Sequence, residues 1–315
     1  MSGCIAVVGA ANIDVGGRSA APLRPGDSNP GTIRTSLGGV GRNIAHNLAL
    51  LGAEVRFVTA LGGDDGARRI RESCRALGIG LDASLTVPEG ATSAYLSIAG
   101  PDGDMALALS DMAIYERLTP AWLAGVLPAL NAAALVVLDA NLPAESIAYL
   151  AENCASPLFA DPVSAAKAPR MRAVLPRLHT LKPNRLEAEI LSGVPVTDEA
   201  SALRAADRLL SSGVRRVFLS LGPGGVLAAE GDQRLLLPNP PQKKRENASG
   251  CGDAFMAALA WAALRGAGLR ESALCGLTAA AVAMESAETV HPGMSAGLIR
   301  SRMECFYHAS SEPLS

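Results

Sequence analysis

The chain has 315 residues, of which 49% are hydrophobic, and 28 lysine and arginine residues stand against 30 aspartate and glutamate residues, for a formal net charge of −2. Such a chain can bury a full core, which excludes a disordered protein, and its charge balance gives no reason to expect nucleic acid or an anionic membrane as a partner. The six cysteines are scattered without a CxxC pair, which argues against a zinc site and against a dense disulfide framework.

The sequence contains no signal for export or membrane insertion. The amino-terminal stretch MSGCIAVVGAANID lacks a basic segment, and its apolar run is too short for a signal peptide. The apolar run at residues 254–264 is cut by Arg265, so it is too short for a transmembrane helix. We therefore expect a cytoplasmic protein.

Short apolar runs and helical repeats alternate along the chain. Residues 5–8 predict a buried strand, and the apolar residues of 40–51 recur at helical spacing until Gly52 ends the helix. Further strands are predicted at 55–60, 135–138, 158–160 and 217–221, and a further helix at 68–77. This alternation predicts an α/β fold with a mostly parallel central sheet and helices on both of its faces.

Two segments depart from this alternation. Residues 14–36 are rich in glycine, proline and serine, and residues 92–112 hold two apolar runs around the turn sequence AGPDGD, which is typical of a hairpin. Neither segment has a helical period. We expect both to form one small β-rich lid beside the main sheet, within a single domain that spans residues 1–315.

The stretch NASGCGDAF, residues 247–255, precedes an apolar helical run. The free N–H groups of a helix start attract anions, and Ser249, Gly250, Cys251 and Gly252 allow that backbone to close around a phosphate. The Asp253 carboxylate would repel a phosphate, but it is suited to act as the base that takes a proton from an attacking hydroxyl. The alternative is that Asp253 only complements the helix start, with Ser249 as its cap.

Two glycine- and asparagine-containing turns lie near the amino terminus. In LGGVGRN, Gly38 and Gly39 allow a ligand to approach the backbone, and Asn43 offers a donor and an acceptor; a tight strand-to-helix turn is the alternative. The chain has no G-x-x-x-x-G-K-[ST], which excludes a Walker-type ATPase. In NID, which follows the first strand, Asp14 could bind a vicinal diol or simply form a turn.

Two further motifs lie in the second half. KPNRLE, residues 182–187, puts Asn184 and Glu187 on one helical face, where they could hold a hydrated magnesium ion with Lys182 near the phosphates. The same spacing also fits an asparagine-capped helix with a capping-box glutamate. LSLGPGGVLAA, residues 219–229, predicts a hairpin that could pack against a nucleotide.

These motifs, in this order, resemble those of the ribokinase-like (PfkB-type) family of sugar and nucleoside kinases, from about residue 5 to about residue 295. The resemblance implies ATP and Mg²⁺ as cofactors and a small-molecule acceptor. It implies that Asp253 is the base, that Gly250, Cys251 and Gly252 form the anion hole, and that Asn12, Asp14, Gly38, Gly39 and Asn43 hold the sugar. It further implies that Lys182, Asn184, Ser220, Gly222 and Gly225 line the ATP site and that Glu187 holds Mg²⁺ through water.

The lid segments, with GDSNPG at 26–31 and ALSDMAIYERLTP at 108–120, look most like those of the pseudouridine kinases within this family, which act on the 5′-hydroxyl. That resemblance makes Ser28, Asn29, Thr92, Asp111 and Met112 candidates to face the uracil ring, and Asn141 a candidate sugar contact. A kinase for another nucleoside or for ribose is the alternative within the family, and a non-catalytic nucleoside-binding protein is the alternative outside it.

Two residues depart from the family pattern, and both affect the expected site. An acidic residue that helps hold a monovalent cation often stands where this chain has Asn247, so potassium activation is an open question. Cys251 replaces a small residue at a helix start, which predicts a reactive thiolate that ATP protects from alkylation.

Members of the family often dimerise through the lid, so we also expect a homodimer, since the apolar hairpin would otherwise expose a sheet face.

Overall fold

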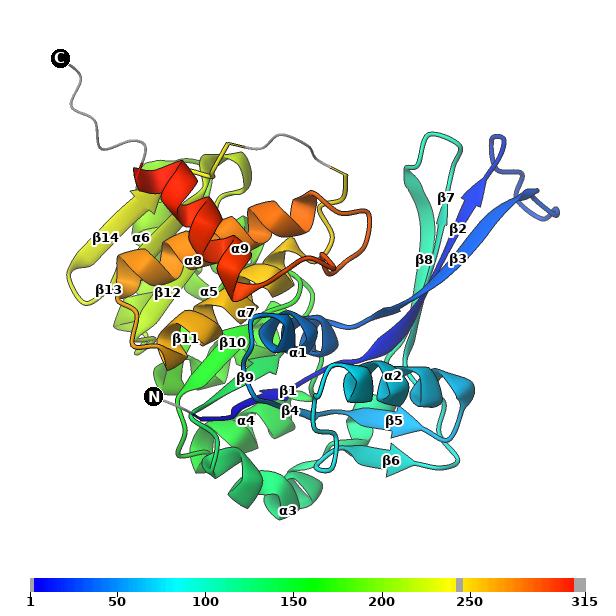
Figure 1. The fold of residues 1–315 in the computed structure, drawn as a ribbon, viewed down its shortest axis with the longest axis horizontal. Coiled ribbons are helices and arrows are strands. Elements are labelled where there is room, and N and C mark those ends of the chain that lie inside the picture. Colours follow the sequence, from blue (N-terminus) through cyan, green and yellow to red (C-terminus); the bar gives the residue numbers. More distant parts are fainter. Residues whose placement is uncertain (1–2, 242–245, 309–315) are drawn as a thin grey trace.

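The computed structural model describes residues 3–241 and 246–308 (Figure 1). Its main sheet has the strand order β14-β13-β12-β11-β10-β9-β1-β4. In this order, the neighbouring strands β12, β11, β10, β9, β1 and β4 pair in parallel. At the other edge, β13 pairs antiparallel with β12, and β14 pairs antiparallel with β13. The predicted mostly parallel sheet is therefore confirmed. Its strands are β1 (Ile5–Val8), β4 (Val55–Val58), β9 (Leu135–Asp139), β10 (Leu158–Asp161), β11 (Leu178–Leu181), β12 (Arg216–Ser220), β13 (Val226–Glu230) and β14 (Gln233–Leu237).

The strands of this sheet are buried on both faces. Ile5 and Val7 of β1 point into one hydrophobic core, and Ala6 and Val8 point into the other, because successive side chains of a strand alternate. The first core is covered by α1 (Val40–Leu50), α2 (Asp65–Ala76), α7 (Cys251–Leu264), α8 (Leu269–Met284) and α9 (Ala296–Met303). The second is covered by α3 (Pro120–Asn131), α4 (Ala144–Asn153), α5 (Arg185–Ser192) and α6 (Glu199–Ser211).

A second sheet projects from the body as the predicted lid (Figure 1). It has four strands in the order β3-β2-β7-β8, namely β2 (Asn12–Ser19), β3 (Gly31–Gly38), β7 (Ala94–Ala99) and β8 (Met105–Asp111). A small third sheet pairs β5 (Ala60–Gly62) with β6 (Leu85–Val87), so the strand predicted at residues 55–60 divides between two sheets. Within the described residues, no helix is both long and apolar enough to cross a membrane.

The lid sheet has one polar and one apolar face. Asp14, Tyr95 and Ser110 are direct register partners, so their side chains share a face, which borders a cavity described below. Val15, Leu96 and Leu109 are the neighbouring register partners and therefore share the opposite face. On that outer face Ile33, Leu107 and Leu109 are 77%, 55% and 61% exposed.

Candidate active site

Two cavities lie beyond the carboxyl ends of the parallel strands, where open α/β sheets place their ligands. They meet at the amino terminus of α7. The first, of about 590 Å³, is lined by Gly250 and Asp253, and the second, of about 450 Å³, is lined by Cys251 and Gly252. Groups held in the two cavities would thus face each other across the first turn of one helix. We call them the acceptor cavity and the nucleotide cavity, after the ligands that the sequence resemblance predicts for them.

The start of α7 is shaped by Gly250. This residue has φ +80°, a left-handed conformation that L side chains rarely adopt, and a Cβ there would collide with the carbonyl oxygen of Thr289. The first helical hydrogen bond runs from the Ala254 N–H to the Gly250 carbonyl, at 2.9 Å. The N–H groups of the residues between them have no helical partner, so this turn can bind an anion.

Asp253 lies in this first turn and points toward α1. The Asn43 side chain donates its Nδ2–H to Asp253 Oδ2 at 2.9 Å. Burial, together with the neighbouring carboxylate of Asp161, raises the pKa of Asp253 to about 7, although Asn43 and Lys182 act in the opposite direction. A carboxylate with such a pKa is suited to exchange protons near neutral pH.

Lys182 supplies a buried positive charge beside the same turn. Its Nζ forms an ion pair with Asp161 at 3.2 Å, and both side chains are almost fully buried. Burial alone would lower the pKa of Lys182, but the carboxylates of Asp161 and Glu187 raise it above its ordinary value. Since a Cβ on Gly252 would lie 3.3 Å from Lys182 Nζ, the ammonium group borders the anion-binding backbone.

The floor of the acceptor cavity comes from the junction of β2, β3 and α1. Asn12 Nδ2 donates to Asp14 Oδ1, and burial raises the pKa of Asp14 to about 6. Gly38 must lack a side chain, because a Cβ there would collide with the Asp14 carboxylate. Gly39, with φ +96°, lies so close to Ala10 that its own Cβ would collide with the Ala10 carbonyl oxygen.

The nucleotide cavity combines a glycine turn with an apolar wall. Gly222 and Gly225 bound the turn after β12, and the Asn239 side chain donates to the carbonyls of Gly222 and Pro223 at 2.8 and 3.2 Å. Leu186 is 63% exposed and lines this cavity, so a ligand ring could cover it. The other lining residues are Lys182, Asn184, Arg185, Ser220, Leu221, Cys251, Gly252, Phe255, Leu277, Ala280 and Met284.

Comparison with known proteins assigns this arrangement to a family. The pattern described as "pfkB family carbohydrate kinase" matches residues 4–295. The chain belongs to the pfkB family of carbohydrate kinases. It is 36% identical to a pseudouridine kinase of Escherichia coli, over 95% of this chain and 96% of that one. It is also 36% identical to an uncharacterized sugar kinase, YeiI, of the same organism, over 92% of this chain and 80% of that one. A structure of Arabidopsis thaliana ribokinase with ribose and ATP superimposes with a TM-score of 0.85, at 22% identity, over 96% of this chain and 99% of that one.

In this pfkB-family protein the acceptor cavity gathers only some of the residues that the sequence suggested for it. Those that line it are Asn12, Asp14, Gly39, Asn43, Met112 and Asn141, and Gly38 lies directly beneath Asp14. Asn12, Asn43 and Asn141 are buried among polar partners. Residues far apart in the sequence, from the lid, α1 and the end of β9, thus meet at one hollow.

Four of the candidate residues do not reach this cavity, which corrects the expectation for them. Thr92 is buried, and its hydroxyl donates to Asp64 at 2.5 Å, where it braces the start of α2. Asn29 borders the outer lid face and bonds to the backbone of Arg24 at 2.8 and 3.1 Å. Ser28 is exposed in the same loop, and the exposed Asp111 accepts from the Ala113 N–H at 3.3 Å.

Asn184 and Glu187 form the capping box that the sequence also allowed. Asn184 donates from its backbone N–H and from its Nδ2 to the two carboxylate oxygens of Glu187, each at 2.8 Å, and its own Oδ1 caps the helix. Glu187 is 3% exposed. No cluster of three or more histidine, cysteine or acidic side chains suited to a metal ion occurs in the described part of the chain.

The expectation of a reactive thiolate at Cys251 is wrong. Burial and the nearby Asp253 carboxylate raise the pKa of the Cys251 thiol to about 11. The helix start favours an anion there, but the loss of solvent and the like charge outweigh it. Asn247 accepts from the Ser249 N–H at 2.9 Å through its Oδ1 and donates from its Nδ2 to the Ala287 carbonyl at 3.3 Å.

Sequence reasoning missed much of the acceptor cavity. The lid contributes Arg34, Ser36, Tyr95, Ser97 and Ser110, which the alternation of side chains along the strands could have indicated from Asp14 onward. The segment after β10 contributes Val163, Ser164 and Lys167, and Lys167 Nζ donates to Asn141 Oδ1. Val163 has φ +67°, a strained conformation for a β-branched residue, and its N–H is held by Asp161 at 2.8 Å.

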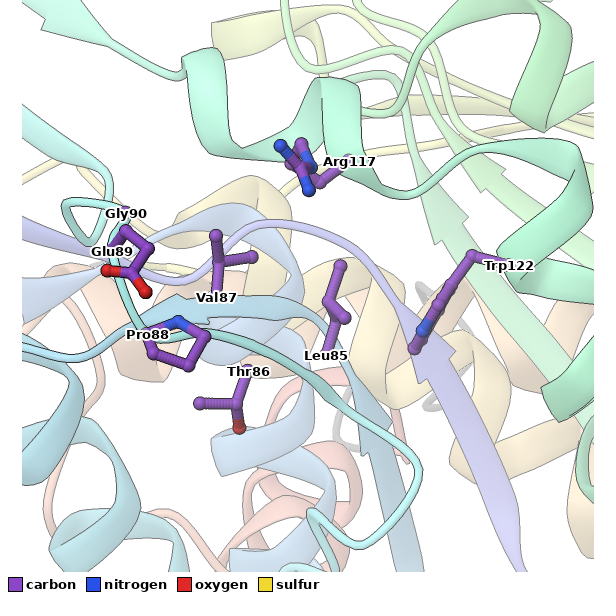
Figure 2. Close-up of a pocket in the computed structure, with 8 residues that line it drawn as sticks. All are labelled: Leu85, Thr86, Val87, Pro88, Glu89, Gly90, Arg117 and Trp122. Carbon is purple, nitrogen blue, oxygen red and sulfur yellow. The ribbon is translucent and has the colours of Figure 1, made fainter.

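Another cavity, of about 390 Å³, shares no lining residue with the acceptor cavity or the nucleotide cavity; Figure 2 shows the residues that line it. It lies between residues 85–90, which include β6, and the side chains of Arg117 and Trp122. None of the candidate catalytic, substrate-binding or ATP-binding residues named from the sequence lines it. The charged side chains that line it, Glu89 and Arg117, are exposed.

Proposed function

We propose that this protein is an ATP-dependent kinase that phosphorylates the 5′-hydroxyl of pseudouridine. The observation that carries the proposal is that the acceptor cavity and the nucleotide cavity meet at the start of α7, with Asp253 on one side and Gly252 on the other. A phosphoryl group in transit between two ligands needs this arrangement, since positioning and charge stabilisation dominate the reaction.

In the proposed reaction, Asp253 takes the proton of the acceptor hydroxyl while the hydroxyl oxygen forms a bond to the γ-phosphorus of ATP. The bond from that phosphorus to the bridging oxygen breaks, and ADP leaves. The N–H groups that follow Gly250 and the buried ammonium of Lys182 stabilise the charge on the transferring group. Asp14 and Asn12 hold the sugar hydroxyls, and the lid excludes water.

The nucleotide cavity supports ATP as the donor. Its wall of Leu186, Phe255, Leu277 and Met284 suits an aromatic base, and its glycine turn suits phosphates or ribose. Magnesium would arrive with ATP, held by its phosphates. Glu187, the residue expected to hold the ion, is 3% exposed, does not line this cavity and accepts hydrogen bonds from Asn184 through both carboxylate oxygens. When bound, the ion would supply positive charge to the phosphates.

The polar lid face supports a nucleoside as the acceptor. Arg34, Tyr95, Ser97 and Ser110 offer donors and an aromatic ring above the sugar-binding floor, and the pseudouridine kinase of Escherichia coli matches nearly the whole chain. Since the identity to the sugar kinase YeiI is the same, a kinase for another nucleoside or for ribose is the second candidate.

The test is ADP release from ATP and magnesium with pseudouridine, uridine, ribose and adenosine as acceptors. Turnover on pseudouridine with little on uridine would support the first candidate, because a site that pairs with the extra ring N–H should reject uridine by about 1–3 kcal/mol. Preferred turnover on ribose or adenosine would support the second. No turnover with any acceptor, together with nucleoside binding, would contradict both.

Turnover should depend on pH through Asp253. A base must be ionised, and the pKa of this carboxyl lies at about 7, so it is protonated and inactive below that pH. We expect kcat/KM for the acceptor to fall by about tenfold per pH unit below about pH 7 and to level off above it. The measurement is the pH profile of kcat/KM with saturating ATP. A flat profile down to about pH 5 would contradict this role.

We further propose that a second copy of the chain covers the outer lid face, so that the protein is a homodimer. Ile33, Leu96, Leu107 and Leu109 form an exposed apolar surface there, which monomeric proteins usually avoid. Leu107→Lys should halve the mass seen by analytical ultracentrifugation. Leu236→Lys, at a 42% exposed leucine on β14, is the matched control and should leave the mass unchanged. A monomeric wild type would contradict the proposal.

A further inference from the structure

Arg42 is a buried cation at the start of α1, behind the acceptor cavity. It is 6% exposed, and all its recorded hydrogen bonds go to uncharged acceptors. Nη1 donates to the Leu37 carbonyl at 2.9 Å and to Asn43 Oδ1 at 3.2 Å. Nη2 makes two contacts of 3.2 Å, with His46 Nδ1 and Ser73 Oγ. The guanidinium thereby joins the end of lid strand β3 to α1 and α2.

The four contacts use the four N–H groups on the two terminal nitrogens of the guanidinium. Since arginine cannot accept a hydrogen bond, His46 Nδ1 must be unprotonated and act as the acceptor. Burial, followed by the charge of Arg42, lowers the pKa of His46 to about 4, which agrees with a neutral ring. The side chain of Arg42 is therefore held in one orientation from several sides.

This orientation determines which way the Asn43 amide points. Its Oδ1 accepts from Arg42, so its Nδ2 is directed to Asp253, at 2.9 Å. In the flipped amide, Nδ2 would face the N–H groups of Arg42 and Oδ1 would face the Asp253 carboxylate. Both hydrogen bonds would be lost at once, and buried donors and acceptors would be left unpaired.

We propose that Arg42 is a positioning residue that fixes the Asn43 amide with its donor toward Asp253 and couples this orientation to the end of the lid strand. The coupling follows from Nη1, which holds the Leu37 carbonyl and Asn43 Oδ1 together. Arg42 itself does not line either cavity. Its role as a positioning residue for catalysis rests on the proposed function.

The kinetic test is a double-mutant cycle with Arg42→Met and Asn43→Ala. If Arg42 acts through Asn43, Arg42→Met in the wild-type protein should lower kcat by about 30-fold and leave the KM for ATP unchanged. In the Asn43→Ala protein, the same substitution should lower kcat by less than about threefold. Ser73→Ala removes one partner of Arg42 that does not lead to Asn43, so it should leave kcat unchanged. Multiplicative effects of the two substitutions would overturn the proposal.

A second measurement does not depend on turnover. The side-chain amide signals of Asn43, identified in ¹⁵N spectra by their loss in Asn43→Ala, should shift and exchange with solvent at least about tenfold faster in Arg42→Met, but not in Ser73→Ala. Unchanged signals would overturn the positioning role. A wild type without turnover on any acceptor would overturn the proposed function, while this measurement would still decide the role of Arg42. If Arg42→Met does not fold, Arg42→Lys serves instead, since a lysine cannot reproduce the four contacts.

Discussion

Asp253→Asn is expected to lower kcat by about a thousandfold, while the acceptor still binds with nearly unchanged affinity. The substitution removes the base but keeps the shape of the side chain, and the asparagine oxygen can still accept the hydrogen bond from Asn43. The measurements are ADP release for turnover and calorimetry for nucleoside binding. This combination separates a loss of chemistry from a loss of the site.

The control for this substitution is Asp65→Asn. Asp65 also lies in the first turn of a helix, α2, but it is exposed and remote from both cavities. If Asp253 only complemented the start of its helix, both substitutions would cost a similar small amount of stability, about 0.3–1 kcal/mol, and neither would affect turnover. Retention of turnover in Asp253→Asn would therefore remove Asp253 from the reaction.

Gly250→Ala is expected to lower kcat by about a hundredfold, because it displaces the backbone N–H groups that would bind the transferring phosphoryl group. The added Cβ would collide with the Thr289 carbonyl oxygen, so the turn must move. The left-handed conformation adds about 1–2 kcal/mol of strain. The measurements are kcat and the thermal unfolding midpoint of the same protein.

Gly266→Ala is the matched control at the other end of the same helix. Gly266 has φ +79°, close to the +80° of Gly250, but no atom would lie within 4 Å of its Cβ. This variant should therefore lose stability through backbone strain alone and keep its kcat. Equal losses of turnover in the two variants would show that strain, and not the position of the turn, accounts for the effect of Gly250→Ala.

Local features of the site could be predicted from the sequence because they depend on neighbouring residues. The glycine turn that starts α7, the capping box of Asn184 and Glu187 and the glycine pair before α1 all involve residues within a few positions of each other. The buried strands were predictable because runs of apolar residues between helical repeats suit a sheet covered on both faces. The order of the glycine-, asparagine- and aspartate-containing motifs along the chain also indicated the family, which the comparison with known proteins shows.

The sequence by itself thus determined the fold class, the family and the local turns, whereas only the tertiary structure decided which side chains share a cavity. Asn29 and Thr92 lie in the lid segments, but strand register and packing direct them to the outer loop and to Asp64. Asn43 reaches Asp253 from 210 positions away, and burial under the packed elements raises the pKa of Cys251. Such contacts depend on how distant elements pack, and no local pattern of residues encodes them.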